Sequence, residues 1–163
     1  MHGECYRESL RREARELGVS DRIRFDDGYR DWESLRTLVR SVDAVLLPYE
    51  EPDQVSSGVL VEALASGKPV IATRFPHAEE LLADGAGILV DDADVDAIAA
   101  ALERLLYEPG LAERMARAAR QTAQPLLWPA VAHAYRTLID RVVRERSAPP
   151  HVLPRRCSRS SLD

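Results

Sequence analysis

Two serines and a glycine form a polar turn that opens an apolar helix, and this turn is the part of the chain best suited to bind an anion. Ser56, Ser57 and Gly58 stand immediately before the run VLVEALASG. This run is typical of a short buried helix, and it contains one carboxylate, Glu62. The first N–H groups of a helix have no intrahelical partner, and together with the helix dipole they favour a negatively charged ligand. The turn is therefore a predicted phosphate site.

Two buried strands and the helix between them must position the turn. Residues 43–47 (DAVLL) are mostly apolar and are followed by Pro48, and residues 69–73 (PVIAT) re-enter the core after the helix stops at Gly67. A strand, a helix and a second strand make one parallel βαβ unit. The turn then lies at the carboxyl end of the first strand, where open α/β sheets bind ligands.

The rest of the chain alternates in the same way and predicts an α/β fold, a Rossmann-like doubly wound and mostly parallel sheet. Further helices are expected over 4–17, 32–41 (capped by Asp31) and 76–83, after Asp92 or Asp94, after Pro109, and from Trp128 to about 142, with further strands over 22–25 and 87–90. The chain begins inside a helix, so the first strands of such a sheet are expected to be missing. The Arg-, Ser- and Pro-rich text from Glu145 predicts a domain over 1–144 and a disordered tail over 145–163.

Composition indicates one ordinary soluble domain and excludes several classes of partner. The chain has 163 residues and a net charge of −5. Residues 145–163 carry +2, so residues 1–144 carry −7, which disfavours a nucleic-acid surface. No apolar run approaches the roughly 20 residues of a membrane span. Cys5 and Cys157 match no metal-ligand spacing, and neither a metal nor a cofactor is expected. Two cysteines of this kind indicate a reducing compartment, and no signal peptide is recognised, so a cytoplasmic location is the default expectation.

The stretch QVSSGVLVEALASGKPVIAT resembles the donor-binding signature of the retaining GT-B glycosyltransferases of group 1. Those enzymes carry a Glu, seven residues and a second Glu, followed by the run A-x-G-x-P-V-[IV]-[AG]-[ST]. The residues that match are Glu62, Ala65, Gly67, Pro69, Val70, Ile71, Ala72 and Thr73. With the flanking DAVLLPY, the GILV strand and the helix from Trp128 to Tyr135, the resemblance covers roughly residues 4–143. It implies the C-terminal half of a GT-B fold, which binds a nucleoside diphosphate sugar.

The resemblance also implies roles for particular residues. Glu62 would accept hydrogen bonds from ribose hydroxyls, and the N–H groups around Ser56, Ser57 and Gly58 would face the diphosphate, with glycine allowing close approach. Gln54 stands where the family has its first Glu. Its amide can hydrogen-bond a sugar hydroxyl but cannot stabilise a developing positive charge, so no catalytic residue is assigned. The alternatives are that Glu62 is a solvated helix residue and that Gln54 is a polar turn residue.

Three further side chains are weaker candidates for the same site. Arg74 and His77 follow the strand 69–73 at its ligand-facing end, where they would meet phosphate and sugar. Tyr29, in the turn after the strand expected at 22–25, would touch the base. Residues in such positions are more often surface residues or packed loop residues.

In the resembled enzymes the acceptor binds a preceding N-terminal domain, and a basic pair early in the donor domain neutralises the diphosphate. Neither region is present in this chain, whose only lysine is Lys68. We therefore expect an N-terminally truncated donor-binding domain that lacks its acceptor domain and does not transfer sugar alone. Two other functions stay open: a non-catalytic nucleotide-binding or interaction module, and a phosphorylatable signalling domain built on Asp26 or Asp27.

Overall fold

The computed structural model describes residues 2–26, 28–50 and 55–147, and contacts divide the chain into two compact units. The first unit is Met1–Leu35 and the second is Arg36–Asp163. The strands of the described residues all lie in the second unit.

A three-stranded parallel sheet forms the centre of the second unit. Its strands are β1 (Val45–Leu47), β2 (Val70–Thr73) and β3 (Gly87–Val90), in the order β1-β2-β3. Every residue of β2 is buried, as expected for a central strand. The strands expected at 43–47, 69–73 and 87–90 are confirmed, and so is the α/β fold class.

Seven helices are found among the described residues, several of them beginning at the expected caps. They are α1 (His2–Glu16), α2 (Trp32–Ser41), α3 (Gly58–Ala65), α4 (Pro76–Leu82), α5 (Val95–Tyr107), α6 (Leu111–Ala123) and α7 (Trp128–Ser147), with 3-10 turns at Ser20–Arg22 and Gln124–Leu126. Asp94 caps α5 by accepting from the N–H of Ala97 at 2.8 Å. Asp31 caps α2 by accepting from the N–H of Ser34 at 2.8 Å, and this bond lowers the pKa of the Asp31 carboxyl.

The core lies between the sheet and the helices that cover it. Ile71 and Val90 pack against Ala101 of α5 on one face of the sheet. Successive strand residues point to opposite faces, so Val70 and Ala72 face the other side. Both are fully buried, which shows that the sheet is covered on both faces.

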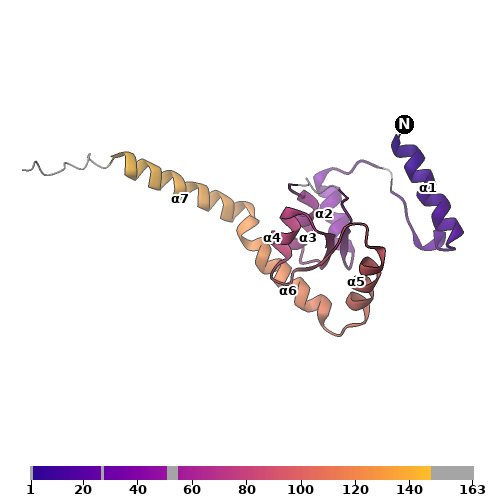
Figure 1. The fold of residues 1–163 in the computed structure, drawn as a ribbon. Coiled ribbons are helices and arrows are strands. Elements are labelled where there is room, and N and C mark those ends of the chain that lie inside the picture. The colour runs from indigo at the N-terminus through magenta and orange to yellow at the C-terminus, as the bar shows by residue number, and fades with distance from the viewer. Residues whose placement is uncertain (1, 27, 51–54, 148–163) are drawn as a thin grey trace, which may run out of the picture. The chain divides into compact units, whose positions relative to one another are not determined.

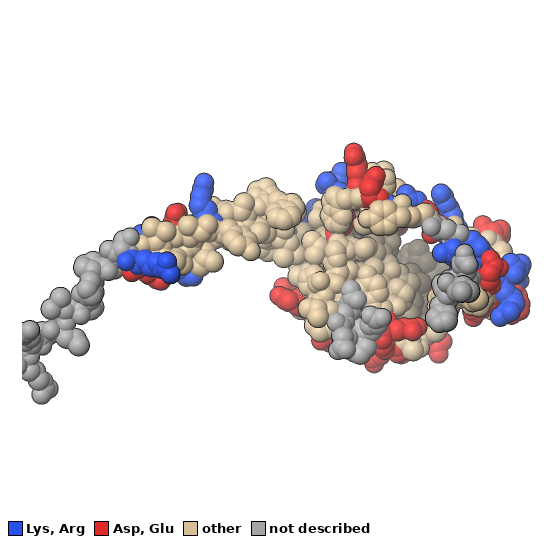
Figure 2. Space-filling view, turned by 90° about the horizontal axis from the view of Figure 1, so that it is seen from above, with Lys and Arg blue, Asp and Glu red and all other residues tan. Residues whose placement is uncertain are grey.

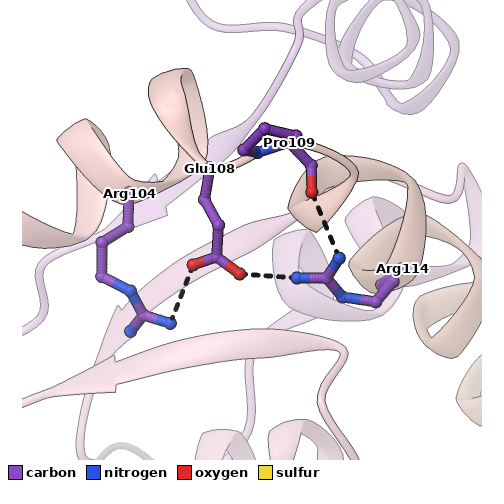
Figure 3. Close-up of polar contacts among 4 residues, drawn as sticks. All are labelled: Arg104, Glu108, Pro109 and Arg114. Atoms are coloured by element: carbon purple, nitrogen blue, oxygen red, sulfur yellow. Dashed lines mark hydrogen bonds and ion pairs between the residues drawn. The ribbon is translucent and has the colours of Figure 1, made fainter.

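The junction of α5 and α6 is held by Glu108. Its carboxylate pairs with Arg104 at 3.5 Å and with Arg114 at 2.6 Å, and Arg114 also donates to the carbonyl of Pro109 at 3.3 Å (Figure 3). These side chains are about half exposed, and ion pairs of this kind contribute less than about 1 kcal/mol each. They link the end of α5 to the first turn of α6.

The prediction of a strand over residues 22–25 is wrong. Ser20–Arg22 forms a 3-10 turn, and residues 23–25 pair with no strand in the described part of the chain. Four alternating residues form a strand only where a neighbour supplies the other half of the hydrogen-bond ladder. Here Ile23 is 43% exposed, and the ring of Phe25 lies 5.5 Å from the guanidinium carbon of Arg11 on α1. The first unit is therefore helical.

The helix α7 follows α6 and is longer than expected (Figure 1). It continues to Ser147, past the boundary expected at 144, whereas residues 148–163 lie outside the described part of the chain, so their disorder stays a prediction. Every side chain from Ala132 to Arg146 is exposed. Its first turns carry no charge, and its charged side chains gather toward its C-terminal end (Figure 2). No described helix combines the length and the apolarity needed to cross a bilayer.

Candidate functional site

Ser57 joins the loops that follow β1 and β2. Its side chain is buried, and its Oγ accepts from the N–H of Leu60 at 3.2 Å, which caps α3. The same Oγ lies 3.2 Å from the hydroxyl of Tyr49, in the loop after β1. The N–H of Ser57 donates to Nδ1 of His77, after β2, at 3.1 Å. The protein itself thus occupies one of the amides that the sequence predicted for a phosphate.

The two strand-end loops are also tied to each other. The hydroxyl of Thr73, the last residue of β2, donates to the carbonyl of Tyr49 at 2.7 Å. The rings of Tyr49 and Phe75 lie 5.2 Å apart between centroids, tilted by 51°, and Phe75 is fully buried. Aromatic pairs in this geometry stabilise by about 0.5–1.5 kcal/mol beyond their burial. The loops around the turn are therefore preorganised by hydrogen bonds and packing.

Glu62 is buried in the middle of α3 and is held by an arginine from α2. Its Oε1 accepts from Nε of Arg36 at 3.1 Å and from the hydroxyl of Ser66 at 3.4 Å. No described residue donates to Oε2. Because every fully buried side-chain oxygen or nitrogen among the described residues has a hydrogen-bond partner, Oε2 keeps some exposure to solvent. The carboxylate therefore keeps one oxygen able to accept from a ligand.

Gly58 lies on the same face of α3 as Glu62, one turn earlier. A Cβ placed on Gly58 would meet no described atom within 4 Å. Its N–H and that of Val59 precede the first engaged N–H groups of the helix, because the N–H of Leu60 donates to Ser57 Oγ and the N–H of Val61 donates to the Ser57 carbonyl. An open backbone edge thus lies one turn from the open oxygen of the carboxylate.

Arg74, predicted to meet a phosphate, has carboxylate partners within the protein. Its Nε donates to Asp91 Oδ1 at 2.9 Å, and its guanidinium lies 3.6 Å from Glu79. Two acidic neighbours offset its positive charge, so a phosphate would have to compete with them. Its phosphate contact stays a prediction.

The structure brings together only some of the site residues predicted from the sequence. Ser57, Gly58 and His77 lie around the start of α3, and Ser56 is exposed beside them. Gln54 lies outside the described residues. Tyr29 is 99% exposed and belongs to the first compact unit, so the structure does not place it at the site.

The sequence reasoning missed Arg36 and Tyr49. Tyr49 carried a usable signal, because it follows a predicted strand at its ligand-facing end. Arg36 carried none, since its partner lies 26 positions away in sequence. No three metal-ligating side chains gather within the described ranges, and the expectation that no metal or cofactor is needed stays a prediction.

Known proteins resemble this chain in sequence. Residues 2–122 match the family model described as glycosyl transferases group 1. The chain is 38% identical over 120 residues to a D-inositol 3-phosphate glycosyltransferase of Corynebacterium diphtheriae, covering 72% of this chain and 27% of that protein. It is 33% identical over 118 residues to a lipopolysaccharide core biosynthesis glycosyltransferase of Rhizobium meliloti, covering 71% and 33% respectively.

Solved structures of GT-B glycosyltransferases share the fold. Sucrose-phosphate synthase from Thermosynechococcus elongatus superposes with a TM-score of 0.68 at 28% identity, covering 86% of this chain and 35% of that one. The Anabaena protein HepE, solved in complex with UDP-glucose, has a TM-score of 0.71 at 23% identity, which shows the fold alone, and covers 87% and 37%. The chain spans about a third of the length of these relatives. Because the family model matches well over half of the chain, this protein belongs to the group 1 glycosyltransferases.

Proposed function

We propose that this chain binds a nucleoside diphosphate sugar as the donor-binding part of a retaining glycosyltransferase. The observation that carries the proposal is the carboxylate of Glu62, which is 6% exposed, is held at Oε1 and keeps Oε2 open. Ionised carboxylates accept hydrogen bonds and cannot donate them, so the ligand group must be a hydrogen-bond donor, such as a hydroxyl. A ribose offers two adjacent hydroxyls.

The diphosphate would lie at the start of α3. The N–H groups of Gly58 and Val59 and the positive end of the helix supply the anion-binding character. The N–H of Ser57 already donates to His77, so we assign it to holding the loop in place. This arrangement puts the phosphate-binding edge and the ribose-binding carboxylate one turn apart on α3.

The proposal also covers the sugar-transfer reaction. In the retaining reaction the sugar leaves the diphosphate and joins an acceptor with the same anomeric configuration. Gln54, at the position of the family's first Glu, can hydrogen-bond the sugar but offers no negative charge. We infer that acceptor binding needs a further domain, because the chain matches only about a third of its relatives' length.

Calorimetry with UDP-, GDP- and ADP-glucose tests donor binding. We expect the parent chain to bind one of them, and Glu62→Ala to weaken that binding by roughly tenfold or more, because a charge-assisted hydrogen bond contributes about 1.5–3 kcal/mol. Glu113→Ala is the matched control, since Glu113 is an exposed helix residue on α6. Circular dichroism establishes that each variant is folded. A parent chain that binds none of the three, or a folded Glu62→Ala variant with parental affinity, contradicts the proposal.

The second candidate is a non-catalytic nucleotide-binding module, which Gln54 in place of a glutamate favours. It predicts the same calorimetric result with no sugar transfer, even when an acceptor-binding domain is supplied. Transfer by such an assembled protein, lost in the Glu62→Ala variant, would exclude this candidate.

A further inference from the structure

The ion pair between Arg36 and Glu62 joins two helices that are far apart in sequence. Arg36 lies on α2 and donates through Nε to Oε1 of Glu62 on α3 at 3.1 Å. The side chain of Glu62 is 8% exposed and that of Arg36 is 45% exposed. The arginine therefore reaches the buried carboxylate from the surface.

The geometry of the pair leaves half of the carboxylate unused. An arginine that serves only to neutralise a carboxylate commonly binds both oxygens in a bidentate fork. Here Arg36 contacts Oε1, and the hydroxyl of Ser66 contacts the same oxygen at 3.4 Å. Both donors of the protein converge on one oxygen, while Oε2 keeps some exposure to solvent.

We propose that Arg36 is a positioning residue for donor recognition. It anchors Oε1 so that Glu62 presents Oε2, in one orientation, to a ribose hydroxyl of the nucleotide. This inference rests on the proposed donor binding and extends it to a residue outside the resembled motif. Its consequence is selectivity: the chain should distinguish a ribonucleotide from its 2′-deoxy counterpart, and Arg36 should be required for that distinction.

The test compares affinities for ribose and deoxyribose nucleotides by calorimetry. The probes are UDP, GDP and ADP, followed by the 2′-deoxy form of whichever the parent chain binds. We expect the parent to prefer the ribonucleotide by roughly tenfold to a hundredfold. Arg36→Met should reduce this preference to less than about threefold, which corresponds to losing most of one charge-assisted hydrogen bond. A general loss of structural integrity would weaken both nucleotides alike and would leave their ratio unchanged.

Arg40→Met is the matched control. Arg40 lies one turn further along α2, is exposed, and makes no ion pair with any residue that the structure describes. It should keep the parental ratio. Arg36→Lys should recover part of the preference, because an ammonium can still donate to Oε1. Should Arg36→Met fail to fold, Arg36→Gln replaces it, and its weaker neutral donor is expected to lower the ratio as well.

The possible failures are distinguishable. If the parent chain binds no nucleotide, both the proposed function and this inference are contradicted. A parent that binds the ribonucleotide and its 2′-deoxy form equally contradicts a contact between Glu62 and the 2′-hydroxyl, and with it the selectivity inferred here. A parent with a clear ribose preference that persists in folded Arg36→Met overturns the role of Arg36 alone.

Discussion

At the residue scale, Gly58 is a position where a substitution can test ligand binding without disturbing the fold. No described atom lies within 4 Å of a Cβ placed there, and the φ of Gly58 is not in the left-handed region. A Cβ at this position therefore clashes with no other part of the protein, and a side chain extending from it would cover the backbone edge where we place the diphosphate.

We expect Gly58→Leu to leave the thermal unfolding midpoint close to that of the parent and to weaken nucleotide-sugar binding by at least about tenfold. Calorimetry and a thermal melt on the same preparation check both halves of this prediction. Gly87→Ala is a useful contrast, because its Cβ would lie 2.6 Å from the carbonyl oxygen of Val70 inside the sheet. Overpacking of this kind destabilises by about 1–3 kcal/mol. Parental donor affinity in Gly58→Leu would place the diphosphate elsewhere.

At the scale of elements, α3 and α7 differ in how they are supported. Leu60 and Leu64 of α3 are fully buried, and Ser57 caps the helix. On α7, apolar side chains such as Tyr135, Leu138 and Ile139 are 45–65% exposed. Because these side chains remain exposed, they contribute little to holding the core together.

Two leucine substitutions should therefore differ strongly in their effect on the free energy of unfolding. Leu60→Ala removes a side chain with 0% exposure and should destabilise by about 2–5 kcal/mol. Leu138→Lys changes an exposed position on α7 and should shift stability by less than about 0.5 kcal/mol. Urea unfolding followed by circular dichroism measures both. Comparable destabilisation by the two variants would mean that α7 packs against the core.

At the scale of the whole molecule, the carboxyl edge of the sheet carries the proposed donor site, and the described residues nearby include few free positive charges. Arg74 is engaged by Asp91 and Glu79, and Arg36 is engaged by Glu62. A diphosphate leaving group is stabilised in the transition state by positive charges and by hydrogen-bond donors directed at it, and here we place only backbone N–H groups at it. The isolated chain should therefore bind a donor better than it can activate it.

We expect the purified chain to show neither hydrolysis nor transfer of a bound nucleotide sugar above the background rate. A coupled assay for released nucleoside diphosphate measures the first, and product analysis by mass spectrometry measures the second. Robust turnover by the chain alone would show that the catalytic groups lie within it, and it would overturn the requirement for a further domain.

Local patterns in the sequence were enough to predict most of the fold. The apolar runs that mark β1 and β2, the bounds of α2 and the caps at Asp31 and Asp94 depend on neighbours within a few positions, which is the range over which capping and burial periodicity act. The turn at Ser57 followed from the same rules, since its Oγ bonds an amide three residues later.

Only the tertiary structure decided what each polar group of the site contacts. Glu62 meets Arg36 across 26 positions, Ser57 meets His77 across 20, and Arg74 meets Asp91 across 17. Residues 22–25 failed to form a strand for a related reason, because a strand also needs a neighbour from elsewhere in the chain. Local pattern determines which elements form, whereas the path of the chain through space determines which side chains can meet.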